Sequence, residues 1–452
     1  MKESFLPDYA GMDVWESYSK DLLRDYRQSI EEGLDVERYK SLFEAVAQMP
    51  DDENKDRIAD VIFDIVCNAP TVEGYPYEEP SDLEGIKRVR KPVELPKLEL
   101  TKEELFDKVY GAWMGRVCGC MLGKTLEGIR TYELIPFLKE SGNYPMHRYV
   151  LSTDATDEVC GKYGYGFAIV PYVDKCGRMP ADDDTNYTVL AQELINSRGR
   201  DFTPNDVANI WVAKQSMGVY CTAERTAFKN FVLGYRPPVS AKYKNVYREL
   251  IGAQIRGDYF GYINPGDTAT AAEMAFRDAS ISHIKNGIYG EMYIAAMIAA
   301  AAVTDDLETI VRAGLGEIPQ KSRLAETVRE IIDDAKAGLT MEQLREKIYS
   351  RYDENDGHDW THTISNAAIV TAALLTGEGD YGRSICAAVQ SGFDTDCNGA
   401  TVGSILGMRN GIDGIGKEWT DPINDTLDTA IFGVGTVSVS ERARMTLDHI
   451  KA

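Results

Sequence analysis

Apolar residues recur along most of this chain at the three- and four-residue spacing that places them on one face of a helix. Within residues 14–66, for example, Leu22, Tyr26 and Ile30 keep this spacing, and Pro50 breaks the pattern. Strictly alternating patterns, which are typical of strands, are scarce, and the sequence has no internal repeat. The pattern therefore predicts an all-α protein.

Residues 68–98 differ from their surroundings because they contain five prolines among several charged residues. This composition favours a linker or a strap that wraps around the protein. We therefore divide the chain into residues 1–98, a helical extension with a proline-rich linker, and residues 99–452, a second domain. No catalytic motif falls in the extension, which could cover the bundle, form a dimer contact or shape the mouth of a site.

A capping box opens the second domain, since Glu104 follows Thr101 by three residues. The apolar stripe behind it predicts a helix that runs to about Cys120, with Gly123 close after its end. Residues 140–180 are rich in glycine, tyrosine and aspartate without a clear period. We expect a long loop or insertion there.

Seven further helices follow from the same spacing, two of them joined as a hairpin around Asn286-Gly287. One begins at Asp184, and the others span Thr268–Ile284, Glu291–Val303, Leu324–Ala337, Met341–Tyr349, Ile364–Leu375 and Asn398–Met408. The last of these carries three glycines, at 399, 403 and 407, on one face. Such a face allows close contact with another helix.

The acidic balance of the chain excludes two classes of partner. The sequence has 72 acidic and 49 basic residues, which give a formal net charge of −23. This charge repels the phosphates of nucleic acids and the surface of anionic membranes, so we expect neither as a partner. A small anionic substrate is still compatible with it, because a bound divalent ion inverts the local field.

We expect a cytoplasmic protein without a signal peptide or a membrane span. Met1–Lys20 lacks an apolar signal core. The most apolar run, Met292–Val303, is shorter than the roughly 20 residues of a span, so it predicts a buried helix. Eight cysteines without a secretory signal favour reduced thiols, and Cys118-Gly119-Cys120 is too isolated for a zinc site. The oligomeric state is not predictable from these features.

Two acidic clusters carry the candidate chemistry. Asp182-Asp183-Asp184 stands at a helix start, where capping alone is a common role for aspartate. Asp394-Thr395-Asp396 lies between small apolar segments, where carboxylates are costly unless they are compensated. A divalent cation is the simplest compensation, and hard oxygen ligands suit Mg²⁺ or Mn²⁺. Together the two clusters could hold two ions that activate water.

With these motifs in view, the sequence resembles the ADP-ribosylglycohydrolase family, which includes the dinitrogenase-reductase-activating glycohydrolases. Four stretches carry the resemblance in the family's order, and it spans roughly residues 102–430. They are Gly111–Gly123 with Glu127-Gly128, Asp182–Thr185, Ala279–His283 and Gly392–Asp396. The two aspartate motifs together are specific, and the other two stretches are supportive.

The resemblance implies an all-α, largely orthogonal helical bundle with a binuclear Mg²⁺ or Mn²⁺ centre. It also implies hydrolysis of the N- or O-glycosidic bond between ADP-ribose and an acceptor. By position, the metal ligands would be Asp183, Asp184, Asp394 and Asp396, with Asp182 and Cys397 where the family has hydroxyl ligands. The catalytic candidates would be Glu127, Asp183 and Asp396, Glu127 matching the family's loop glutamate. Cys120 stands where the family commonly has aspartate.

Three further residues are candidates for contacting the substrate. His362 could form a pocket wall near the metal site, or could pack against Trp360 at a helix start. Arg225 and Arg256 are the most plausible anchors for an anion, since arginine binds phosphate through two parallel hydrogen bonds. An ordinary salt bridge is the commoner role for either arginine.

We therefore predict a metal-dependent hydrolase that acts on an ADP-ribosylated protein. A second hypothesis is a glycohydrolase for a small nucleoside or sugar metabolite. A third is a metal-binding structural protein of the same fold without turnover, which the cysteines at positions 120 and 397 favour.

Overall fold

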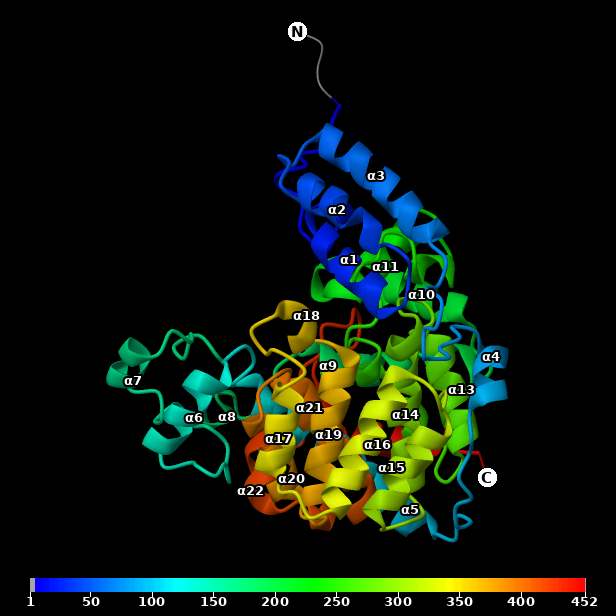
Figure 1. Cartoon of the computed structure of the whole chain (residues 1–452). Helices are drawn as coiled ribbons and strands as arrows, with labels where there is room; N and C mark the ends of the chain where they lie inside the picture. The colour runs from blue at the N-terminus through cyan, green and yellow to red at the C-terminus, as the bar shows by residue number, and fades with distance from the viewer. Residues whose placement is uncertain (1–4, 452) are drawn as a thin grey trace.

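The computed structural model describes residues 5–451, and almost all of its regular structure is helical (Figure 1). The strands within this range are β1 (Thr426–Leu427) and β2 (Val437–Ser438), which pair antiparallel as a two-residue ladder. The prediction of an all-α protein is confirmed.

The first helices come from the extension and from the segment that follows it. Their bounds are α1 (Leu22–Glu31), α2 (Lys40–Ala47), α3 (Glu53–Asn68), α4 (Leu83–Val89), α5 (Lys102–Lys124), α6 (Thr131–Glu140), α7 (Asp157–Lys162), α8 (Val173–Cys176), α9 (Asp183–Arg198), α10 (Pro204–Lys214), α11 (Thr222–Val232) and α12 (Asp258–Tyr262).

The remaining helices complete the bundle. They are α13 (Thr268–Ala279), α14 (Lys285–Ala301), α15 (Leu307–Gly316), α16 (Arg323–Lys336), α17 (Met341–Tyr349), α18 (Gly357–Trp360), α19 (Thr363–Thr376), α20 (Tyr381–Gln390), α21 (Thr395–Asn410), α22 (Lys417–Thr420) and α23 (Val439–Leu447). Short 3₁₀ turns lie at 18–20, 37–39, 217–219, 239–241, 254–256, 412–414 and 421–423.

The extension contains α1, α2 and α3, as the spacing within residues 14–66 predicts, and the break at Pro50 separates α2 from α3. Figure 1 shows these helices beside α10 and α11, above the main bundle. The strap of residues 68–98 is largely extended, but it also contains α4, which the spacing did not predict. Asp82 makes this short helix possible, because its side chain caps the first turn at the Gly85 N–H.

The apolar residues form two separate cores. The smaller core joins Leu22 and Phe43 of the extension to Leu250 of the second domain, and the larger one fills the bundle. The extension therefore buries its apolar face against the second domain, and the division near residue 98 stays a prediction.

Helices α5 and α21 pack antiparallel through glycines spaced four residues apart. The facing positions are Gly111 with Gly407, Gly115 with Gly403, Gly119 with Gly399 and Gly123 with Thr395. A β-carbon at any of these glycines on α5 would overlap the carbonyl oxygen opposite. The close contact predicted for the glycine face of α21 is confirmed.

The helix end predicted near Cys120 is wrong, because α5 continues to Lys124. Gly123 lies inside the helix rather than after it. It is a glycine because the backbone of Thr395 occupies the space of a side chain.

The hairpin turn predicted at Asn286-Gly287 is also wrong, since both residues lie in the first turn of α14. The Asn286 backbone N–H and Nδ2 each donate to Glu249 Oε1 at 2.9 Å. Gly287 faces the carbonyl oxygen of Arg248. The two residues therefore pack against the 248–249 segment instead of forming a turn. The chain turns at residues 280–284.

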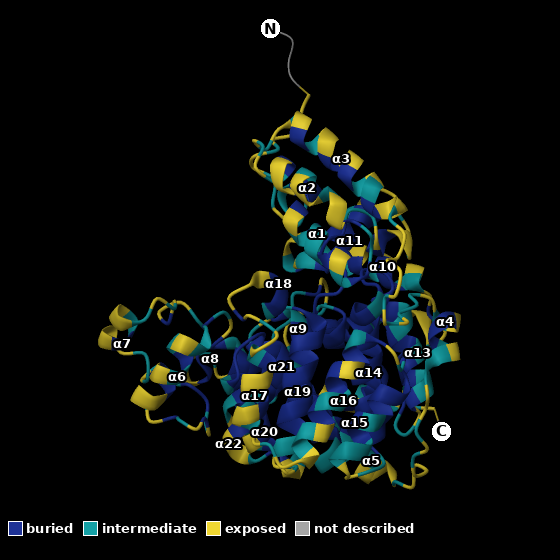
Figure 2. Ribbon diagram, viewed as in Figure 1, coloured by how far each residue is buried: buried dark blue, intermediate teal, exposed yellow. Residues whose placement is uncertain are grey.

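Residues 140–180 project from the bundle as the predicted insertion and contain only the short helices α7 and α8 (Figure 1). Burial is highest at the centre of the bundle, along α14, α19 and α21 (Figure 2). The buried helix predicted from Met292–Val303 is confirmed as part of α14. Within residues 5–451, the helices are either too short or too polar to cross a membrane.

Candidate metal centre

Two acidic segments far apart in the sequence meet at one end of the glycine-packed helix pair. Because α5 and α21 run antiparallel, the last turn of α5 lies beside the first turn of α21. Helix α9 starts at the same place, since Lys124 in the last turn of α5 donates to Asp182, the cap of α9. The structure thus brings Asp182–Asp184 and Asp394–Cys397 together.

The first turn of α9 fixes the carboxylates of Asp182 and Asp184. Asp182 caps the helix, and its Oδ1 accepts the Asp184 N–H at 2.9 Å. The Asp184 side chain is fully buried, and its Oδ1 lies 3.0 Å from Arg116 Nη2. Arg116 also donates to the Asp184 carbonyl and pairs with Asp258 at 2.8 Å. Since Arg116 is itself buried, it holds Asp184 in a single position.

A tight turn before α21 positions Asp394. Phe393 is buried and adopts a φ of 56°, a left-handed conformation that bulky residues rarely take. Trp360 Nε1 donates to its carbonyl oxygen at 2.5 Å, and Asn366 Oδ1 accepts the Asp394 N–H at 3.1 Å. These hydrogen bonds hold the turn in its strained conformation. Asp396 then follows in the first turn of the helix.

The acidic side chains and two thiols form two groups of potential ligand atoms, which share Asp184. One group is Asp184, Asp396 and Cys397, and the other is Cys120, Asp182 and Asp184, with the atoms of each group within 4.8 Å of one another. Asp184 Oδ2 is buried and has no hydrogen-bond partner within residues 5–451. A buried carboxylate oxygen without a donor is costly unless a cation binds it, so the residues fit a metal ion.

The carboxylates raise one another's pKa values. Burial, together with the charges of Asp182 and Asp396, raises the pKa of Asp183 to about 8. The negative charges of Asp396 and Asp182 raise the pKa of Glu127 above its usual range. Burial also holds the pKa of Asp394 well above its usual range. The negative charges of neighbouring carboxylates therefore oppose the ionisation of all of them at once. A divalent cation among these groups would lower their pKa values again.

Glu127 lies in the loop after α5, where its side chain is 43% exposed, and its nearest cation is Lys124 at 4.0 Å. The Tyr165 hydroxyl, from the insertion, donates to the carbonyl oxygens of Thr125 and Glu127 at 3.0 and 2.9 Å. The insertion therefore holds the loop that carries this carboxylate.

The predicted anion anchors both form ion pairs with carboxylates that do not belong to the acidic cluster. Arg225 pairs with Glu16 of the extension at 2.5 Å. Arg256 is 2% exposed and pairs with Glu224 at 2.6 Å and with Asp278 at 2.5 Å. Each arginine thus forms an ordinary salt bridge, which the sequence analysis gives as the commoner role.

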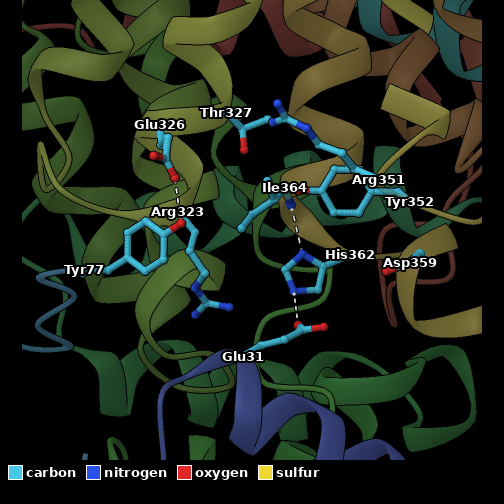
Figure 3. A pocket seen from close by; sticks show the side chains of 10 residues that line it. All are labelled: Glu31, Tyr77, Arg323, Glu326, Thr327, Arg351, Tyr352, Asp359, His362 and Ile364. Carbon is cyan, nitrogen blue, oxygen red and sulfur yellow. Dashed lines mark hydrogen bonds and ion pairs between the residues drawn. The ribbon is translucent and has the colours of Figure 1, made fainter. Parts of the chain in front are cut away.

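His362 lines a separate cavity of about 300 Å³, and Glu31 of the extension lines the same cavity (Figure 3). Its Nδ1 accepts the Ile364 N–H at 3.1 Å as the cap of α19, and its Nε2 lies 3.7 Å from Glu31 Oε2. His358 contacts the same carboxylate oxygen at 3.0 Å. The side chain of His362 forms neither a hydrogen bond nor an ion pair with the acidic cluster within the described residues. Its place as a pocket wall near the metal site stays a prediction.

Sequence reasoning missed Arg116 and Lys124, which both contact the aspartates. A signal was present, since Arg116, Cys120 and Lys124 are spaced by four residues and share one face of a helix. It was overlooked because the predicted helix ended at Cys120, before Lys124. Asn366 was missed for lack of any motif.

Comparison with known proteins agrees with the motifs. A solved structure described as an ADP-ribosylglycohydrolase-related protein complex is similar to this chain, with a TM-score of 0.49 and 17% sequence identity over 77% of this chain and 98% of that one. Among curated proteins, none matches this sequence significantly. The family model for ADP-ribosylglycohydrolase matches residues 101–443, which is most of the chain. This chain therefore belongs to the ADP-ribosylglycohydrolase family.

Proposed function

We propose that this protein hydrolyses a ribosyl-type N- or O-glycosidic bond with the help of divalent cations, and that an ADP-ribosylated protein is its leading substrate. The observation that carries the proposal is the convergence of Asp182–Asp184 and Asp394–Cys397 around the unpartnered Asp184 Oδ2. Family membership supports glycohydrolase chemistry.

The cation would be held by Asp184 and Asp396, with Asp183 and Asp394 beside them. When bound, a divalent ion of this kind supplies Lewis acidity towards water and sugar hydroxyl groups. Carboxylate oxygens favour Mg²⁺ or Mn²⁺, which are the ions we propose. The two acidic clusters of the sequence predict two such ions.

Glu127 is the proposed general base. It is exposed enough to meet a water molecule, and it lies on a loop that is anchored rather than part of a helix. Its pKa is high because Asp396 is negative, so neutralising Asp396 lowers it towards the ionised form that accepts a proton. Asp183, which is partly exposed, is the second carboxylate that could accept that proton.

A second candidate substrate is a small nucleoside or sugar compound without phosphates. The placement of the predicted anchors favours it, because Arg225 and Arg256 are both bound to carboxylates. A diphosphate would then lack the two arginines that the sequence suggested for it. A non-catalytic metal-binding role is the third candidate, motivated by Cys120 and Cys397 in the ligand groups.

Product release separates these candidates. The purified protein is incubated with peptides ADP-ribosylated on arginine or serine, and in parallel with nucleosides and simple ribosides, with Mg²⁺, Mn²⁺ or a chelator. Metal-dependent release of free ADP-ribose supports the leading proposal. Release of ribose from the neutral substrates alone favours the second candidate. Metal binding without turnover on the whole panel would leave only the third.

A further inference from the structure

Three side chains of α5 face the aspartates of the site at four-residue intervals. Arg116 Nη2 lies 3.0 Å from Asp184 Oδ1, and Lys124 Nζ lies 2.5 Å from Asp182 Oδ2. Cys120 lies between them in sequence and belongs to the ligand group of Asp182 and Asp184. Four-residue spacing places all three on one face of the helix, so α5 directs two positive charges at the first acidic motif.

Lys124 engages the side chain of Asp182 where a metal ion would have to bind. One oxygen of Asp182 accepts the Asp184 N–H and the other accepts from Lys124. The Asp182 side chain is 1% exposed and that of Lys124 is 21% exposed, so solvent screens this pair weakly. A divalent ion bound to the same oxygen would lie within about 4 Å of an ammonium group, where like charges repel strongly.

Among the described residues, the ligand group of Asp184, Asp396 and Cys397 forms no ion pair with a lysine. Asp184 Oδ2, Asp396 and Cys397 lie together, and the Asp184 oxygen is buried without a partner among the described residues. Arg116 binds the opposite oxygen of Asp184, so it orients that carboxylate without covering the free atom. This group therefore remains available to one cation.

We propose that this chain binds a single divalent ion, at Asp184, Asp396 and Cys397, and that the Lys124 ammonium takes the place of a second ion beside Cys120 and Asp182. The inference rests on the metal-binding part of the proposed function. Lys124 supplies the positive charge at Asp182, whereas Arg116 is shared between Asp184 and Asp258. Of the two ions proposed above, a thiol in the remaining group favours Mn²⁺ over Mg²⁺.

Counting bound Mn²⁺ tests the proposal on the full-length protein. After equilibrium dialysis against saturating Mn²⁺, we expect one ion per chain in the wild type and two in Lys124→Met, which frees Asp182. The control Lys162→Met, which removes a surface lysine paired with Glu140, should keep one ion. Electron paramagnetic resonance adds a second readout, because two neighbouring Mn²⁺ ions give an exchange-coupled spectrum and one ion does not.

Two ions in the wild type, or none, would overturn the proposal, and so would one ion in a folded Lys124→Met protein. Circular dichroism establishes whether that variant folds, and if it does not, the wild-type count alone decides. The readout does not depend on turnover. A wild type that binds one ion but cleaves no glycoside would therefore contradict the proposed function and leave this inference intact.

Discussion

Gly119 of α5 and Gly399 of α21 lie so close that a β-carbon on either residue would overlap the carbonyl oxygen of the other. This is the third of four such backbone contacts between the two helices. The fourth, between Gly123 and Thr395, lies next to Asp396. The separation of the two helices at the metal centre is therefore set by backbone contact.

We expect Gly119→Ala to lower the free energy of unfolding by about 1–3 kcal/mol, because the methyl group has no space and forces the helices apart. The same displacement should weaken Mn²⁺ binding. Urea denaturation and calorimetric titration measure the two effects. Gly161→Ala is the control, since a β-carbon there meets no atom within 4 Å. Equal stability of Gly119→Ala and the wild type would contradict the close packing.

Removing two carboxylates should abolish the metal site. In Asp394→Asn combined with Asp396→Asn, we expect Mn²⁺ affinity to fall by more than the roughly 10- to 100-fold typical of lost outer-shell partners. Calorimetric titration gives the affinity, and Asp333→Asn combined with Asp334→Asn on α16 serves as the control for charge. Unchanged binding in the first variant would rule out this centre.

Cys397 should govern which ion the protein prefers. Its thiol lies in the ligand group with Asp184 and Asp396, so Cys397→Ser replaces a soft donor by a hard one. We expect the ratio of Zn²⁺ to Mg²⁺ affinity to fall several-fold, as measured by competition titration. Cys386→Ser, which changes a buried thiol of α20, should leave the ratio as it is. An unaltered ratio in Cys397→Ser would show that the thiol is not a ligand.

His362 should make the protein less stable in mild acid. Burial lowers the pKa of His362 to about 3, whereas an unfolded histidine has a pKa of about 6.5. Between these values the unfolded chain binds a proton that the folded chain does not, so stability falls as pH falls from 6.5 towards 3. For His362 alone, the free energy of unfolding falls by about 2 kcal/mol between pH 7 and pH 5.

Urea denaturation at pH 7 and pH 5 measures this loss. His362→Asn preserves a capping acceptor for the Ile364 N–H and has no titrating ring, so it should lose about 2 kcal/mol less than the wild type over the same interval. The same pH dependence in both proteins would assign the effect to other groups.

The helices and the two aspartate motifs were predictable because each has a local signature. Thr101 and Glu104 form the capping box that the sequence indicates, and Asp182 caps α9. The neighbours of the site were less predictable, because they depend on which helices touch. Gly123 has the same local appearance whether it ends a helix or accommodates the backbone of Thr395. Local sequence therefore predicts elements better than it predicts their contacts.

The partners of charged residues illustrate the same limit. Arg225 and Arg256 looked like anchors for an anion, and both are neutralised by carboxylates more than 15 residues away in sequence. Lys124 follows Cys120 by four residues, but the predicted helix ended before it, and its contact with Asp182 was not predicted. Whether an arginine or lysine is free to bind a ligand depends on the folded charge distribution, which a single sequence does not display.

Tyr165 connects the projecting insertion to the site through one hydroxyl group. That hydroxyl donates to the carbonyl oxygens of both Thr125 and Glu127, and the Thr125 hydroxyl donates to the carbonyl oxygen of Pro171 in the insertion, so the insertion is bonded to the Glu127 loop at two places. A molecule that displaces the insertion must therefore either move the Glu127 carboxylate with it or leave two backbone carbonyl groups without their donor. Movement of the insertion is thereby coupled to Glu127, the proposed general base.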